Sequence, residues 1–184
     1  MGLFDFLFGG SKADLTDSIP QTDAEKWSVA VYALWSEFSN GSYKYFGGFE
    51  KNKSNSALAR RVLDRDWLVT DKKSALDTIN YLLNDRKDKD TPAFDYGCAA
   101  NMAARCYLCD LLTKEEMMAE EAKVAELIRA HYNSWDEFIQ NYIEQADKGM
   151  TGGTSDHRET FRQIYARLRA LPDSPYSIDW NTSL

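Results

Sequence analysis

The sequence predicts an all-α protein, a single-domain irregular bundle of about seven helices around a buried central helix at residues 91–112. Two observations support this fold class. The central stretch is apolar on nearly every side of a helix, and a helix that is hydrophobic all round is a buried one. On both sides of it, apolar residues recur at helical spacing behind Ser, Thr or Asp residues that can cap a helix.

The composition is that of a globular, acidic protein without a membrane span. Hydrophobic residues make up 43% of the chain, and no apolar run approaches the roughly 20 residues that cross a bilayer. The formal net charge of -7 would repel phosphate backbones, so we expect no nucleic-acid partner. All three cysteines lie within the central stretch, which suits reduced thiols in the cytoplasm. A short apolar start that contains Asp5 predicts no secretory signal.

The first ten residues, MGLFDFLFGG, form an amphipathic tip. On a helix, its large apolar side chains would share one face: Leu3, Phe4, Leu7 and Phe8. The functional interpretation is an anchor for a partner protein or for peripheral contact with a membrane. The alternative, a segment that folds back on its own core or on a neighbouring subunit, is favoured because the basic residues that assist interfacial helices are missing. We therefore expect tip and linker at residues 1–20 and one all-α domain at residues 21–184.

The first helix of the domain is marked by a capping box. Thr22 and Glu25 form this box ahead of a helix with Trp27 and Leu34 on its apolar side. Residues 42–55 then form an aromatic, glycine-containing loop. Its rings could line a pocket, but a loop pinned over the core by its rings is the favoured interpretation.

The remaining helices follow from caps and apolar spacing. They are expected at residues 56–66, after Thr70, at the central stretch, after Thr113, after Ser134 and from about 156 to 171. The tail beyond residue 171 cannot be helical at its prolines, yet it is rich in apolar rings. We expect it to pack back across the bundle.

Polar side chains are rare on the central helix. They are Asp95, Asn101 and Arg105, of which the last two are four residues apart on one face. One interpretation is a ligand or catalytic pocket. The other is an internal hydrogen-bond network that fixes how the helices pack, with Asp95 near the positive helix N-terminus. The network is favoured because buried polar groups seldom go unpaired.

The three cysteines raise the question of a metal or redox site. Cys106 and Cys109 form a Cys-x-x-Cys pair, and Cys98 lies on nearly the same helical face. Zinc sites usually take ligands from two separate elements, and neither His131 nor His157 has ligand spacing to them. A redox pair would normally lie at a helix N-terminus instead of mid-helix. We expect the three cysteines to act as small buried hydrophobes. We also expect that the protein binds no metal and no cofactor.

A basic stripe lies on the last predicted helix. Arg158, Arg162 and Arg169 are spaced by four and seven residues, beside the apolar face. The stripe could bind an acidic partner or a phosphate. The favoured alternative pairs these arginines with the glutamates of the helix after Thr113 or with Asp173 and Asp179, because both signs of charge are nearby.

Short motifs in the second part of the chain resemble a known family. They are Trp67-Leu-Val-Thr70, Phe94-Asp95-Tyr96, Ser134-Trp135-Asp-Glu-Phe138 and the closing Ser174-Pro175-Tyr176-Ser-Ile-Asp-Trp180. Together they resemble the bacterial domain of unknown function family 1266, over roughly residues 60 to 184. Here Cys98 stands where the family has an Arg after the Asp, and Tyr176 replaces a Trp. The resemblance implies no activity, because the family is uncharacterised.

The sequence therefore predicts a cytoplasmic, non-catalytic protein-interaction module that uses the tip or the arginine stripe. Its partner would be another protein. The alternative is a small-molecule binder or enzyme with a pocket near Asp95, Asn101 and Arg105. No catalytic residue is predicted, because no Gly-rich phosphate loop, nucleophile elbow or paired-histidine zinc motif is present in the sequence.

Overall fold

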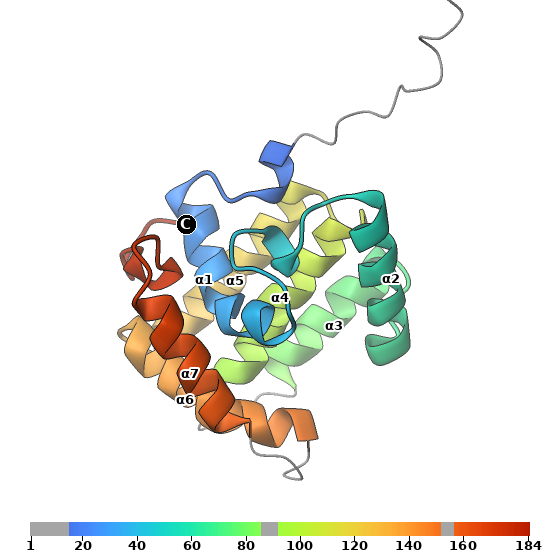
Figure 1. Ribbon diagram of the computed structural model, residues 1–184. Coiled ribbons are helices and arrows are strands. Elements are labelled where there is room, and N and C mark those ends of the chain that lie inside the picture. Colours follow the sequence, from blue (N-terminus) through green and yellow to red (C-terminus); the bar gives the residue numbers. More distant parts are fainter. Residues whose placement is uncertain (1–14, 86–91, 152–156) are drawn as a thin grey trace, which may run out of the picture.

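The computed structural model describes residues 15–85, 92–151 and 157–184 (Figure 1). These ranges contain no strand and seven α-helices, which confirms the predicted all-α class. The helices are α1 (Asp23–Phe38), α2 (Lys53–Trp67), α3 (Lys72–Asn84), α4 (Ala93–Leu108), α5 (Lys114–His131), α6 (Trp135–Thr151) and α7 (Arg158–Arg169). Three short 3-10 helices lie between or beside them: η1 (Leu15–Ser18), η2 (Phe46–Gly48) and η3 (Pro175–Ser177). None of the helices described has the length and hydropathy of a membrane span.

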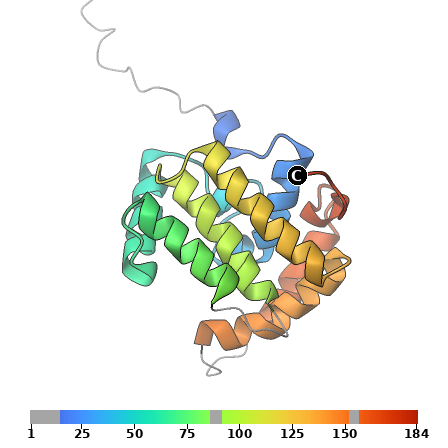
Figure 2. The same ribbon diagram turned by 180° about the vertical axis from the view of Figure 1, so that it is seen from behind.

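The central helix of the bundle is α4. It packs against α1, α2, α3, α5 and α6, and Figure 2 shows it between α3 and α5. Every residue of α4 is buried except Cys98 and Arg105. Small residues allow the close approach of its neighbours, since a Cβ at Gly97 would lie 2.4 Å from a ring carbon of Tyr142 on α6. The predicted burial of the central helix is confirmed.

The helix α4 is shorter than the predicted stretch. It ends at Leu108, because Asp110 has a left-handed φ of 60° and the carbonyl of Cys106 accepts the N–H of Leu111 at 2.8 Å. The apolar residues Cys109, Leu111 and Leu112 pack against the core but do not continue the helix, and Asp110 between them is exposed.

The start of α4 is capped from another helix. Pro92 precedes the first helical residue and makes no side-chain cap, while Thr91, the predicted cap, lies outside the described residues. The first two N–H groups of the helix donate instead to the side-chain oxygens of Asn141 and Gln145 on α6, at 3.4 and 2.9 Å. The N-terminus of α4 is therefore bonded within the protein.

Local capping chemistry explains where the other helices begin. Thr22 and Thr113 form the predicted capping boxes at the starts of α1 and α5. At α3 the prediction is wrong by one residue, because Asp71 rather than Thr70 accepts the N–H of Ser74. Both residues can cap, so only the backbone register decides between them.

The aromatic loop between α1 and α2 is pinned over α4. Phe46 of η2 is buried, and its ring meets that of Tyr107 edge to face at a centroid distance of 5.8 Å. Gly47 has a φ of 65°, and a Cβ there would lie 3.2 Å from the backbone of Ala104. The glycine thus lets the loop approach the central helix closely.

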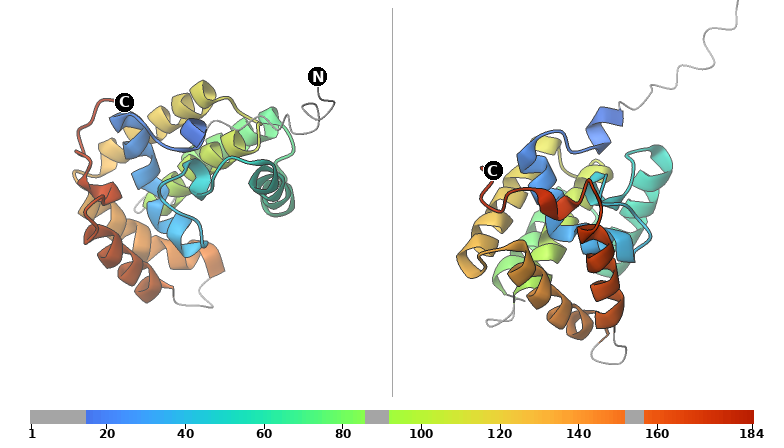
Figure 3. Two further views of the ribbon diagram at one scale, coloured as in Figure 1. Left: turned by 45° about the horizontal axis from the view of Figure 1, so that its top comes forward. Right: turned by 60° about the vertical axis from the view of Figure 1, so that its left-hand side comes forward.

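The C-terminal segment packs back across α1, as the sequence predicts (Figure 3, right). The indole N–H of Trp27 on α1 donates to the carbonyl of Trp180, and that of Trp135 on α6 donates to the carbonyl of Ile178, both at 3.0 Å. The three indole rings, which we call the tryptophan cluster, meet pairwise at centroid distances of 5.0, 5.8 and 4.9 Å. This cluster joins both ends of the domain.

Residues 15–20, expected as linker, lie against the bundle. The hydroxyl of Tyr107 donates to the carbonyl of Asp17 at 2.8 Å, and the N–H of Lys51 donates to the hydroxyl of Ser18 at 2.7 Å. The predicted tip lies outside the described residues, and the proposed domain boundary stays a prediction.

Candidate ligand-binding site

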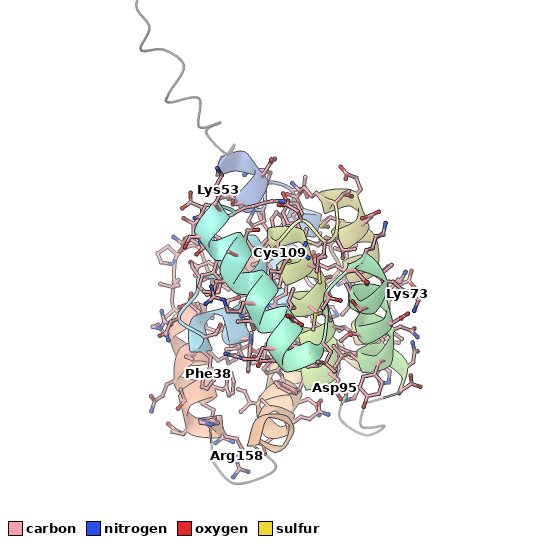
Figure 4. The ribbon with its side chains drawn as sticks, turned by 90° about the vertical axis from the view of Figure 1, so that its right-hand side faces the viewer. Phe38, Lys53, Lys73, Asp95, Cys109 and Arg158 are labelled. Carbon is pink, nitrogen blue, oxygen red and sulfur yellow. The ribbon has the colours of Figure 1, made fainter. Side chains whose placement is uncertain are left out.

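A cavity of about 320 Å³ lies between α1, α2 and α4. Its wall is formed by Trp35 of α1, by Val62, Leu63, Asp66 and Trp67 of α2, and by Phe94, Cys98, Asn101, Met102 and Arg105 of α4. Figure 4 looks onto α2, which lies over this side of α4. The volume is at the lower end of the roughly 300–1,000 Å³ of small-molecule sites.

The face of α4 that lines the cavity follows from helical spacing. Phe94, Cys98, Asn101 and Arg105 are spaced by four, three and four residues, so they form one row along the helix. This row contains both α4 residues that are not buried. The cavity therefore lies along the side of the central helix that the neighbouring helices do not cover completely.

One end of the cavity is aromatic. Figure 4 shows the start of α2 near the end of α4 and Asp95 at the opposite end, so the two helices run antiparallel. The last residue of α2, Trp67, thus lies at the same end of α4 as Phe94. The ring of Trp35 meets Phe94 edge to face at a centroid distance of 6.2 Å. These three rings provide an apolar, aromatic wall.

Two residues of the cavity wall have a buried N–H donor with no acceptor among the described residues. Asn101 is only 5% exposed, and its Nδ2 has no hydrogen-bond partner. The Nε of Arg105 is also buried without a partner. A buried donor that loses its hydrogen bond costs about 1–3 kcal/mol, and more when it is charged. Both donors lie one helical turn apart on the cavity row.

The charge of Arg105 is not neutralised by an ion pair. Burial lowers the pKa of its guanidinium, while Cys98 and Asp66 act in the opposite direction. Asp66 lies at the exposed rim and accepts hydrogen bonds from the Nε and Nη2 of its neighbour Arg65 through both carboxyl oxygens. In the described ranges no carboxylate is ion-paired with Arg105, so the cavity retains a cation.

A second, smaller cavity adjoins the first. It has a volume of about 210 Å³ and shares Val62 and Arg105 with its neighbour. Phe49 of the aromatic loop and Leu58 of α2 form part of its wall. Arg105 therefore separates two hollows beneath the same helix.

The structure groups the predicted polar residues in part. Asn101 and Arg105 line one cavity, but Asp95 is buried in the first turn of α4 and is not in the cavity wall. Sequence reasoning missed the cavity roles of Trp35, Trp67 and Cys98. For Cys98 the spacing from Asn101 and Arg105 was a usable signal, whereas no local pattern marks the two tryptophans.

Two of the three cysteines, Cys106 and Cys109, have the environment of buried hydrophobes. Burial raises the pKa of Cys106 to about 12, and burial also raises the pKa of Cys109. A thiol that stays protonated is a weak nucleophile and metal ligand. None of the three cysteines forms a disulfide, and the described residues contain no group of side chains that could hold a metal ion. Only Cys98 lines the cavity.

The arginine stripe is paired within the protein. Arg162 and Arg158 lie 2.7 and 3.7 Å from the carboxylate of Glu144, and Arg169 lies 3.7 Å from Asp136. Both acids belong to α6, not to α5 or the C-terminal segment, because α7 packs on α6 (Figure 1). Exposed pairs of this kind contribute about 0–1 kcal/mol.

Comparison with known proteins places the central helix in a family. The family model described as "Protein of unknown function (DUF1266)" matches residues 86–180, slightly more than half of the chain. The chain belongs to the DUF1266 family. The searches of curated proteins and of solved structures find no match. The DUF1266 region contributes the α4 wall of the cavity and two of the three clustered tryptophans, whereas α1 and α2 lie outside it.

Proposed function

We propose that this DUF1266 protein binds a small molecule in the cavity between α1, α2 and α4. The supporting observation is that two residues of the cavity wall, Asn101 and Arg105, each have a buried donor, Nδ2 and Nε, without an acceptor among the described residues. Nearly all buried polar groups in folded proteins have a partner. A ligand with acceptor atoms would satisfy both donors once the two side chains turn their N–H groups toward it.

The competing interpretation is a structural network on the central helix. Such a network requires that these polar groups bond to one another or to neighbouring helices. Asn101 Nδ2 and Arg105 Nε lack those bonds, although the N–H groups at the start of α4 have them. The contrast favours a site that is completed by a ligand.

We propose that the protein binds this small molecule without catalysing a reaction on it. Asn101 and Arg105 donate hydrogen bonds but do not exchange protons near neutral pH, so neither is suited to general acid–base catalysis. The carboxylate at the rim, Asp66, is held by Arg65. Recognition is therefore the role that these groups support.

Filling the cavity should abolish binding. Val62 of α2 lines both hollows, so Val62→Trp places an indole in the ligand's space. Ala57→Trp, at an exposed position of the same helix that lines neither hollow, is the matched control. In a thermal-shift screen of metabolites, a ligand at a hundred times its dissociation constant should stabilise the wild type and the control by about 2.7 kcal/mol. Val62→Trp, checked for folding by circular dichroism, should show no shift.

Two results would contradict the proposal. One is a screen in which no compound stabilises the wild type. The other is a ligand that stabilises Val62→Trp as strongly as the Ala57→Trp control.

A second proposed function is docking of a partner protein through the tip, in the cytoplasm. The arginine stripe, the other candidate surface, is engaged by α6, which leaves Leu3, Phe4, Leu7 and Phe8 as the proposed contact. Deleting residues 1–10 should abolish co-purification of a partner while the melting temperature changes little. Unchanged partner recovery from the truncated protein would exclude this role, and lost binding to anionic vesicles would indicate a membrane instead.

A further inference from the structure

We infer that the ligand of this cavity is a small aromatic carboxylate. Its carboxylate would bind Asn101 and Arg105, and its ring would lie against Trp35, Trp67 and Phe94. This inference rests on the proposed function, because it names the class of molecule that the same cavity takes.

The charge of the cavity selects an anion. Arg105 stays protonated at neutral pH, and its buried Nε has no partner. Asp66, the carboxylate in the cavity wall, already accepts both hydrogen bonds from Arg65. A buried charge is costly in free energy unless it is paired. A negatively charged ligand would pair with the guanidinium and so gain binding free energy that a neutral ligand does not. A ligand that carried an ammonium group would meet repulsion from the guanidinium.

The number and geometry of the donors favour a carboxylate over a phosphate. The Nε–H and one Nη–H of a guanidinium form a fork that matches two carboxylate oxygens. Asn101 Nδ2 adds one donor a helical turn away. Phosphate sites commonly add the N–H groups of a helix N-terminus. At α4 these groups are taken by Asn141 and Gln145, so they are not available to a phosphate.

The direction of the side chains brings the cation toward the rings. Side chains on a helix lean toward its N-terminus, so the guanidinium of Arg105 extends back over the turn of Asn101 and Cys98. One molecule can therefore reach both the donors and the aromatic end of the cavity.

The aromatic end determines the body of the ligand. Rings pack against rings in offset or edge-to-face contacts, as Trp35 and Phe94 already do with each other. A volume of about 320 Å³ limits the molecule to one or two rings.

The test titrates phenylacetate and indole-3-acetate into the full-length protein by calorimetry. Phenylacetamide removes the charge, cyclohexylacetate removes the aromatic ring, phenylalanine adds an ammonium group, and inorganic phosphate replaces the carboxylate. We expect at least one of the two aromatic carboxylates to bind at least about tenfold more tightly than every control compound.

Arg105→Gln should weaken carboxylate binding at least about tenfold and leave the weak binding of phenylacetamide unchanged. Arg61→Gln, at an exposed position of α2, is the matched control and should bind as the wild type does. Arg105→Lys keeps the charge but loses the fork of donors. Its affinity for the carboxylate should therefore lie between those of Arg105→Gln and the wild type. Unfolding midpoints of all variants exclude a folding defect as the cause.

The outcomes separate this inference from the proposed function. One outcome is that other compounds bind to the wild type and not to Val62→Trp, while phenylacetate and indole-3-acetate do not bind at all. In that case the cavity binds ligands, and the carboxylate class is wrong. The carboxylate class is also wrong if the wild type binds phenylacetamide or inorganic phosphate as tightly as the aromatic carboxylates. It is wrong as well if Arg105→Gln binds these carboxylates as tightly as the wild type does. If no compound binds at all, both proposals fail.

Discussion

Replacing Trp135 with alanine should destabilise the protein by about 3–5 kcal/mol, the range for a buried Trp or Phe that is cut to Ala. Trp135 is 5% exposed, and its ring lies 5.0, 4.9 and 5.7 Å from those of Trp27, Trp180 and Tyr176. Its indole N–H also donates to the carbonyl of Ile178. The substitution leaves a cavity and an acceptor without its donor, and both effects act in the same direction.

The loss should release the C-terminal segment before the rest of the bundle. Urea unfolding followed by circular dichroism measures the free energy, and amide hydrogen exchange at residues 176–182 should accelerate more than exchange in α4. Tyr81→Ala, 49% exposed on α3, is the control and should change stability by no more than about 0.5 kcal/mol. Equal effects of the two substitutions would show that the tryptophan cluster contributes no special stability.

The parts of the fold that depend on neighbouring residues were predictable. Thr22 and Thr113 start helices because their side chains bond to N–H groups three residues later, and this chemistry is visible in any sequence. The end of α4 was not predictable in the same way. Apolar residues continue to Leu112 because the core buries them, while the left-handed turn at Asp110 ends the helix.

The candidate site was predictable only in its central-helix half. Asn101 and Arg105 are conspicuous as polar residues within an apolar helix. Asp95 is a third polar residue of this helix, but it lies six residues before Asn101, about 240° around the helix, so it faces elsewhere. Trp35 and Trp67 come from helices whose docking on α4 is a matter of tertiary packing, which periodicity along one helix does not encode.

The second large effect concerns Glu121 of α5, which lies on the buried face of its helix, four residues after Met117 and three before Val124. Its side chain is buried, with 2% exposed, and within the described residues neither carboxyl oxygen has a partner at hydrogen-bond geometry. Burial raises the pKa of Glu121 to about 8. The nearby hydroxyl of Ser28 favours the ionised form, whereas Glu25, ion-paired with Lys114 at 2.7 Å, opposes it. Glu121 is therefore a neutral acid in the folded protein at neutral pH.

The direction of the pH dependence follows from this raised pKa. The unfolded chain releases the Glu121 proton near the ordinary pKa of 4.5, but the folded protein keeps it up to about pH 8. Between these values the folded state binds more protons, so the free energy of unfolding falls by about 1.4 kcal/mol per pH unit. The contribution is fully present below about pH 4.5 and is lost above about pH 8, a total on the order of 3 to 5 kcal/mol.

Glu121→Gln keeps the shape of the neutral acid and cannot ionise, so it should remove this slope. Near pH 5 the variant and the wild type should differ little, and by pH 8 the variant should be more stable by several kcal/mol, on the order of the total above. Glu126→Gln, exposed on the same helix, is the control and should follow the wild-type profile within about 0.5 kcal/mol. Urea unfolding at half-unit pH steps measures all three profiles. Parallel profiles for Glu121→Gln and the wild type would mean that Glu121 is ionised in the folded protein, so that a buried partner for its charge must exist.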